Sequence, residues 1–184
     1  MIYGDFKGCS TRLRPVTMDD AEFIFNARTL ENRNQYLSPI DGTVDNQREW
    51  LKKYFLRHAD RLEYYWVIED TNHNSHGLIR IYDINWSDRS FLIGSWLILP
   101  GAPLLMAQES TALCYEYAFH ELQLETCRFD VMRNNRKVIR FHRCYAREVS
   151  SDEEFLHFEF SRKEFENSFF TQFLTAEKQK DKSL

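Results

Sequence analysis

SFLIGSWLILPGAPLLMAQ, which runs from Ser90 to Gln108, is the longest uncharged segment of the chain. Its first half reads as a buried strand, PGAP interrupts the pattern, and the residues from Leu104 onward open a helix. A turn that leads from a strand into a helix presents free N–H groups and the positive end of the helix dipole. Such turns commonly bind anions, so the segment predicts a ligand that carries phosphates.

The same segment does not read as a membrane span. A transmembrane helix needs about 20 apolar residues in one continuous helix, whereas Pro100, Gly101 and Pro103 interrupt this segment at its midpoint. Proline removes a backbone donor and clashes with the preceding turn. An ordinary buried strand and helix that bind no ligand would show the same pattern, so the rest of the chain has to separate the two interpretations.

Composition favours one globular domain. The 184 residues, 15% of them aromatic, are enough to bury a core without disulfides or metal. We assign residues 1–178 to this domain and residues 179–184 to a frayed, charged tail. A formal charge of −4 argues against nucleic acid as the main partner, because binding to a phosphate backbone needs a net basic face.

Cysteine and histidine usage indicates a reduced, cytoplasmic protein without a metal site. The four cysteines are widely spaced, with no CxxC pair, and the N-terminus lacks the pattern of a signal peptide. His73 and His76 lie in TNHNSHG, which reads as a polar hairpin loop without acidic or cysteine ligands. We therefore expect four free thiols and no bound metal.

Hydrophobic periodicity gives the order strand, two helices, three strands, helix, strand, helix, strand. Thr17 and Asp20 are spaced as in a capping box, which places a helix start at this point. The strands are expected over residues 11–15, 64–69, 78–84, 90–99, 125–132 and 154–160, and the helices over residues 19–28, 45–58, 104–122 and 135–144.

Taken in order, these segments resemble the GCN5-related N-acetyltransferase (GNAT) superfamily, in particular its ribosomal-protein N-terminal and amino-sugar acetyltransferase branch. The resemblance is carried over about residues 11–165 by RLRPVTMDDAEFIF, YWVIED, HGLIRIYDI, IGSWLILP and YEYAFHELQLETCRFDVMRNNRKVIRFH. The last of these is most similar to enzymes that acetylate a nucleotide-linked amino sugar. The resemblance implies a single α/β domain, with helices on both faces of a mixed, mostly antiparallel sheet that splays between its fourth and fifth strands.

The resemblance also implies acetyl-CoA as cosubstrate, with the pantetheine arm hydrogen-bonded along the exposed edge of the fourth strand. In this chain that edge would be Leu97, Ile98 and Leu99. A backbone N–H near Trp96 or Leu97 would face the thioester oxygen. Removing a donor of this kind typically lowers the rate about 100-fold or more.

The phosphate loop departs from the family pattern, which has a basic residue or Gln followed by glycines. The matching positions here read PLLMAQ and contain no glycine. Ala107 stands where a small residue is expected, and Gln108 offers a side-chain donor. Contacts with the phosphates are expected from Leu105, Met106, Ala107, Gln108 and Glu109, mainly through backbone N–H groups.

The helix after Asn134 also departs from the family, which commonly places a tyrosine there as general acid for the CoA sulfur. This chain has His142 at that position, and an imidazole with an ordinary pKa of about 6.5 would donate a proton at neutral pH. A packed core histidine is the alternative interpretation, with Tyr145 as a second donor on the same helical face as Phe141. Asn135 is expected to cap this helix and to reach the CoA arm.

Candidate substrate residues come from the first helix and the third strand. Arg28 matches an arginine of the sugar-modifying relatives and is expected to hold a nucleotide phosphate. Arg80 and Tyr82 share one face of the third strand, and Asp83 lies on the other. Asp83 or Glu69 would accept a proton from the incoming ammonium, although each also reads as a solvated surface charge.

These residues predict an acetyl-CoA-dependent N-acetyltransferase in which a neutral amine attacks the thioester directly. The expected acceptor is a small-molecule amine, first a nucleotide-linked amino sugar. Acetylation of a protein N-terminus is the alternative within the same class, and a non-catalytic member that senses ligands or assembles with other proteins is the alternative from another class. The sequence leaves a homodimer open.

Overall fold

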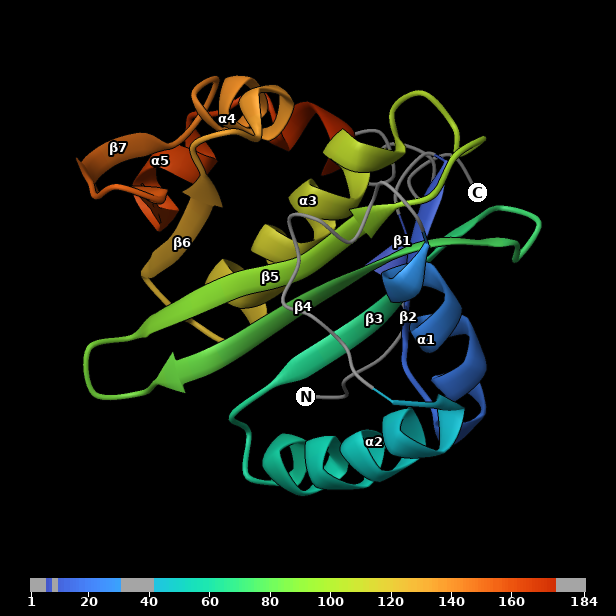
Figure 1. The fold of residues 1–184 in the computed structure, drawn as a ribbon. Coiled ribbons are helices and arrows are strands. Elements are labelled where there is room, and N and C mark those ends of the chain that lie inside the picture. The colour runs from blue at the N-terminus through green and yellow to red at the C-terminus, as the bar shows by residue number, and fades with distance from the viewer. Residues whose placement is uncertain (1–5, 8–9, 31–41, 175–184) are drawn as a thin grey trace, which may run out of the picture.

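The computed structural model describes residues 6–7, 10–30 and 42–174. A sheet of eight strands, in the order β1-β2-β3-β4-β5-β6-β8-β7, lies at its centre (Figure 1). All neighbouring strands are antiparallel except β5 and β6. The strands are β1 (Phe6–Lys7), β2 (Thr11–Pro15), β3 (Tyr64–Asp70), β4 (Ser75–Asn85), β5 (Ser90–Ile98), β6 (Thr126–Met132), β7 (Arg147–Ser151) and β8 (Phe155–Ser161).

Helices cover both faces of this sheet, with α1 and α2 on one face and α3 on the other (Figure 1). Successive residues of a strand point to opposite faces, so Tyr65 and Val67 pack with α1 and α2, whereas Trp66 and Ile68 pack on the α3 side. Burial on both faces explains the unbroken apolar run of β3. The helices are η1 (Met18–Asp20), α1 (Ala21–Thr29), α2 (Val44–Ala59), α3 (Met106–Glu116), the π-helix η3 (Tyr117–Glu121), α4 (Arg136–His142) and α5 (Arg162–Glu166).

The predicted capping box at Thr17 and Asp20 is confirmed. The Asp20 carboxylate accepts hydrogen bonds from the Thr17 backbone N–H (2.6 Å) and hydroxyl (3.0 Å). It also forms an ion pair of 2.7 Å with Arg14 on β2. The start of the first helix is thereby tied to the sheet, which fixes the direction in which α1 runs.

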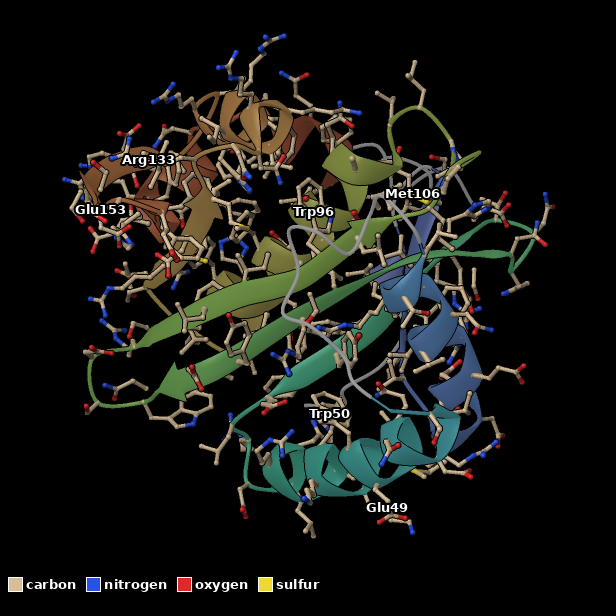
Figure 2. All side chains as sticks on the ribbon, in the orientation of Figure 1. Glu49, Trp50, Trp96, Met106, Arg133 and Glu153 are labelled. Atoms are coloured by element: carbon tan, nitrogen blue, oxygen red, sulfur yellow. The ribbon has the colours of Figure 1, made fainter. Side chains whose placement is uncertain are left out.

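A buried tyrosine docks α2 onto β3. The Tyr54 hydroxyl accepts a hydrogen bond of 3.0 Å from the backbone N–H of Tyr65. Trp50, one turn earlier, stacks on Tyr54 with ring centroids 5.9 Å apart. Figure 2 shows Trp50 on the side of α2 that faces the sheet and Glu49 on the opposite side. The packing of Tyr54 therefore brings Trp50 to the sheet surface.

The sheet opens between β5 and β6. These strands pair in parallel only where Ser90, Phe91 and Leu92 lie beside residues 126–128. Beyond Leu92 they diverge, and β5 continues to Ile98 with β4 as its partner on one edge alone (Figure 1). The predicted splay between the fourth and fifth strands of the sequence is thus confirmed, as are the mixed sheet and the helices on both faces.

Three short elements were not predicted, namely β1, β7 and α5. The predicted helix over residues 135–144 is shorter, because the chain turns after His142 and the N–H of Tyr145 donates to the His142 carbonyl (3.0 Å). Cys114, Cys127 and Cys144 are free thiols that form no disulfide. Cys9 and the predicted tail over 179–184 lie outside the described residues. No helix in the described part of the chain has the length and apolarity to cross a membrane.

Candidate active site

The divergence of β5 and β6 produces a cavity of about 1600 Å³. β5 and β6 flank it, α3 and α4 contribute residues from one side of the sheet, and α1 and α2 contribute residues from the other. The predicted site residues that line it are Arg28, Arg80, Tyr82, Trp96, Leu97, Ile98, Ala107, Gln108, Asn135, Phe141, His142 and Tyr145. Segments that are far apart in sequence therefore meet at one place, as the predicted site requires.

A β-bulge interrupts β5 where the cavity opens. The register changes from Leu78 opposite Leu97 to Arg80 opposite Gly94, so that two β5 residues, Ser95 and Trp96, face a single residue of β4. Ser95 has a φ of 49°. A bulge of this kind disrupts the local hydrogen-bond ladder and redirects the neighbouring groups. The bulge was not predicted from the sequence, although the expected thioester donor lies at this position.

Glycine is required beside the bulge. A Cβ atom added to Gly94 would lie 2.9 Å from the Tyr82 ring, closer than real Cβ contacts. The missing side chain lets the tyrosine ring lie against the β5 backbone. Tyr82 and β5 together thereby form one surface of the cavity.

Two amides at the start of α3 are already hydrogen-bonded to the preceding turn. The Met106 N–H donates to the Pro103 carbonyl (3.1 Å), and the Glu109 N–H donates to the Leu105 carbonyl (2.9 Å). The N–H groups of Ala107 and Gln108 lie in the first turn, where a helix has no acceptor of its own to offer, and both residues line the cavity.

Several predicted residues do not line the cavity. Met106 is fully buried in the core, and the Glu109 carboxylate is buried and accepts hydrogen bonds from the Ser10 N–H (2.9 Å) and hydroxyl (3.0 Å). Leu105 is 45% exposed outside the cavity. The Leu99 N–H donates to the His76 carbonyl (2.7 Å), so its backbone continues the pairing with β4. Helical periodicity accounts for the burial of Met106 and Glu109, since positions 106 and 109 share the inner face of α3.

The opposite wall begins at Asn135. Its side chain accepts a hydrogen bond of 3.4 Å from the Val138 N–H, so the predicted cap of α4 is confirmed. A contact between Asn135 and CoA stays a prediction. Its neighbours Asn134, Arg136 and Lys137 line the same cavity. The sequence analysis did not single these out, although the run NNRK already marked a polar, cationic helix start.

His142 lies on the inner face of α4 among aromatic rings, with centroids 4.4 Å from Phe129 and 5.8 Å from Trp96. Its Nδ1 is hydrogen-bonded to the Tyr145 hydroxyl, which is 3.4 Å from the Tyr115 hydroxyl. Burial lowers the pKa of His142 to about 3 and raises the pKa of Tyr145 well above its usual range. The ordinary pKa assumed from the sequence was therefore wrong, because the imidazole is neutral and the phenol protonated at neutral pH.

The hydrogen bond between the Tyr145 hydroxyl and Nδ1 of His142 needs one proton between them. A neutral imidazole carries one proton, and we infer that Tyr145 donates to Nδ1 of His142 and leaves that proton on Nε2. His142 then presents a neutral N–H donor in place of an imidazolium acid. Trp96 stacks on the neighbouring Phe141 with ring centroids 5.2 Å apart, on the side of β5 toward α4 (Figure 2).

We call Arg28, Trp50, Arg80 and Tyr82 the acceptor wall. The Arg80 guanidinium lies 4.3 Å from the centroid of Tyr82 and 5.4 Å from that of Trp50. Its Nη1 is 3.6 Å from the buried carboxylate of Glu63. Arg28 donates to the Ser95 hydroxyl (3.4 Å), which places its head at the β5 bulge. Trp50 was not predicted as a site residue.

The two carboxylates expected to accept a proton lie elsewhere. Asp83 is exposed, and Glu69 is buried in ion pairs with Arg14 (2.6 Å) and Arg12 (3.1 Å); neither lines the cavity. The acidic residue that does line it, among those the structure describes, is Asp130 on β6. Its carboxylate is 2.6 Å from Nδ1 of His157. Hydrogen bonds to Asp130 and Asp152 raise the pKa of His157, so this carboxylate already has a hydrogen-bonded partner.

Comparison with known proteins agrees with this geometry. A sequence model of the Acetyltransferase (GNAT) domain matches residues 11–144. The chain belongs to the GNAT superfamily. It is an acyl-CoA N-acyltransferase, and its acyl donor is acetyl-CoA. None of the curated protein sequences matches it.

Solved GNAT structures share the fold over most of their length. The chain is 33% identical to apo FdhC, described as a nucleotide-linked sugar GNAT, with a TM-score of 0.83 and coverage of 90% of this chain and 94% of FdhC. Spermidine N-acetyltransferase from Vibrio cholerae, in complex with CoA and spermine, is 21% identical, with a TM-score of 0.74 and coverage of 84% and 97%. A dodecameric structure of the V. cholerae enzyme is 20% identical, with a TM-score of 0.70 and coverage of 84% and 95%. At such identities these last two show the fold alone.

Proposed function

We propose that this GNAT enzyme acetylates the primary amine of a nucleotide-linked amino sugar. The observation that carries the proposal is the charge of the cavity. Arg28 and Arg80 line its acceptor wall, against the single carboxylate of Asp130 among the described residues. A cavity with this balance favours a ligand that brings negative charge.

Charge separates this acceptor from a polyamine. A protonated polyamine entering the cavity would meet Arg28 and Arg80, and the one carboxylate that lines it among the described residues, that of Asp130, is already hydrogen-bonded to His157. A nucleoside diphosphate instead suits guanidinium groups, which bind phosphate oxygens in a bidentate manner. Trp50 and Tyr82 add aromatic surface on which a base or sugar ring can pack. The solved relative FdhC is also described as acting on a nucleotide-linked sugar.

The reaction we propose is direct transfer. The neutral amine attacks the thioester carbonyl carbon, a C–N bond forms, the C–S bond breaks, and the proton lost by the amine ends on the CoA sulfur. A backbone N–H of β5 at the bulge, near Trp96 or Leu97, stabilises the developing oxyanion. The role of His142 is to donate a hydrogen bond from its neutral Nε2–H to the departing sulfur, while it keeps its own proton and the sulfur takes the proton lost by the amine.

A thiol-release assay tests the acceptor. We expect turnover with a nucleoside-diphosphate amino sugar and much weaker turnover with the same amino sugar lacking the nucleotide. Spermidine and a peptide with a free N-terminus are the matched alternatives. Preferred turnover of spermidine or of the peptide would reject the proposed acceptor. Calorimetry with acetyl-CoA is the parallel control, because lack of binding at millimolar concentration would favour a non-catalytic member of the family.

A further inference from the structure

Four cations on and before α4 have no carboxylate partner in the described part of the chain. Arg133, Arg136, Lys137 and Arg140 are exposed, and the hydrogen bond made by Arg133 goes to the backbone carbonyl of Asp152. We call these four residues the α4 cations. Elsewhere a carboxylate lies within ion-pair distance of Arg12, Arg14, Arg48, Arg57, Arg80, Arg89, Arg128, Arg143, Arg147 and Arg162.

The α4 cations border two connected sites. Arg136 and Lys137 line the large cavity. Arg133, Arg136 and Arg140 also line a smaller hollow of about 500 Å³, together with Arg143, whose guanidinium is paired with Glu148. Because Arg136 belongs to both, the hollow lies beside the α4 end of the cavity. In a chain with a net charge of −4, such a group of unpaired guanidiniums points to an anionic ligand.

The turn before α3, on the wall of the cavity opposite α4, indicates which anion this would be. The turn before α3 lacks the glycines that normally bring backbone to phosphate, and Leu104 there is 91% exposed. Its backbone donors on the cavity, among them the N–H groups of Leu104, Ala107 and Gln108, are uncharged. A CoA nucleotide carries a diphosphate and a 3′-phosphate, and charged donors bind phosphate more strongly than neutral amides do.

We propose that Arg136, Lys137 and Arg140 bind the phosphates of acyl-CoA from the α4 side of the cavity and compensate for the glycine-free turn. The inference rests on the acyl transfer proposed above. Guanidinium groups form bidentate hydrogen bonds with phosphate and keep their charge at any physiological pH. Arg133, at the rim of the hollow, adds to the local positive potential.

Calorimetry with free CoA and 3′-dephospho-CoA tests this role without turnover. We expect Arg136→Ala/Arg140→Ala to weaken CoA binding about 10- to 100-fold, the range for lost charged hydrogen bonds. Arg48→Ala/Lys52→Ala on α2 is the matched control, because it removes the same charge from exposed side chains outside the cavity. The control should bind CoA as the wild type does. All four substituted side chains are on the surface, so the variants should fold.

Each outcome decides the proposal. A loss confined to CoA places the arginines on the 3′-phosphate, and an equal loss with 3′-dephospho-CoA places them on the diphosphate. Wild-type affinity for CoA in Arg136→Ala/Arg140→Ala would overturn the inference and leave the acyl transfer intact. The same holds if the variant loses only binding of inorganic phosphate, because the hollow would then hold a separate anion. If the wild type itself bound no CoA, the proposed function would fail first.

Discussion

The acceptor wall and the α4 cations hold positive charge in opposite ways. Arg80 is half-buried, paired with Glu63 and enclosed by two aromatic rings. Arg136 and Arg140 are exposed and have no carboxylate partner in the described residues. A cation that is already oriented loses little side-chain entropy when its ligand arrives, whereas a free arginine loses up to about 2 kcal/mol. The first arrangement suits discrimination among acceptors, and the second suits attraction of a highly charged donor.

The largest expected effect is on kcat, and it concerns His142, a neutral side chain on the inner face of α4. His142→Phe should lower kcat about 100-fold, the loss typical of a transition-state donor. CoA affinity should change little, because the α4 cations remain. Steady-state kinetics would measure kcat, and calorimetry would measure CoA affinity separately. Unchanged kcat would show that His142 is a packing residue and that α4 contributes to binding alone.

Removal of the oriented cation comes next. Arg80→Ala should lower kcat/KM for a nucleotide sugar about 30-fold, within the range for lost charged hydrogen bonds. Arg57→Ala is the control, since Arg57 also pairs with Glu63 but does not line the cavity. Equal losses in both variants would indicate that the Glu63 ion pairs stabilise the fold and that Arg80 makes no special contact with the acceptor.

A smaller effect is expected at Arg28, which donates a long hydrogen bond to Ser95 (3.4 Å) at the β5 bulge. Arg28→Ala should raise the KM for a nucleotide sugar about 10-fold. The KM for a simple amine should stay the same, because such an acceptor has no phosphate to hold. The KM should be measured for both acceptors. A similar rise for both would contradict a contact between Arg28 and a phosphate of the acceptor.

A separate prediction concerns stability and its dependence on pH. The folded pKa of His142, about 3, lies below its unfolded value of 6.5, so the unfolded chain binds a proton that the folded chain excludes. This contribution to stability is present above pH 6.5 and is lost as the pH falls toward 3. Urea unfolding should show wild type losing up to about 1.4 kcal/mol per pH unit more than His142→Phe in this window. Parallel curves would mean that the imidazole is accessible to protons in the folded state.

Local patterns were sufficient for most of the sheet, because alternation and turn residues specify strands such as β3 and β4. The capping box of Thr17 and Asp20 correctly marked the start of a helix. The same signal at Ser161 and Glu164 was present but not used, and α5 begins there, with the Glu164 carboxylate accepting from the Ser161 N–H (2.7 Å). The exposed, polar strand β7 had no apolar alternation to reveal it.

The splay and the candidate site required more than local pattern. Nothing in the periodicity of β5 says that its pairing with β6 stops at Leu92, and only the family resemblance predicted it. The pKa of His142 depends on rings brought from β5 and β6, which no spacing along one helix reveals. In the sequence Glu69 reads as a surface charge, whereas in the structure Arg12 and Arg14 enclose it. Which charged side chains pair across neighbouring strands is set by the register of those strands.

The short contact between β5 and β6 has a kinetic consequence. Arg28 and Trp50 reach the cavity from the helices over one face of the sheet, whereas Ala107 and Gln108 reach it from α3 over the other. Residues from both faces of the sheet therefore line one cavity, and we expect both substrates to bind before acetyl transfer. Initial-rate plots should intersect, as for a ternary complex, and no acetylated protein should accumulate when acetyl-CoA is supplied alone.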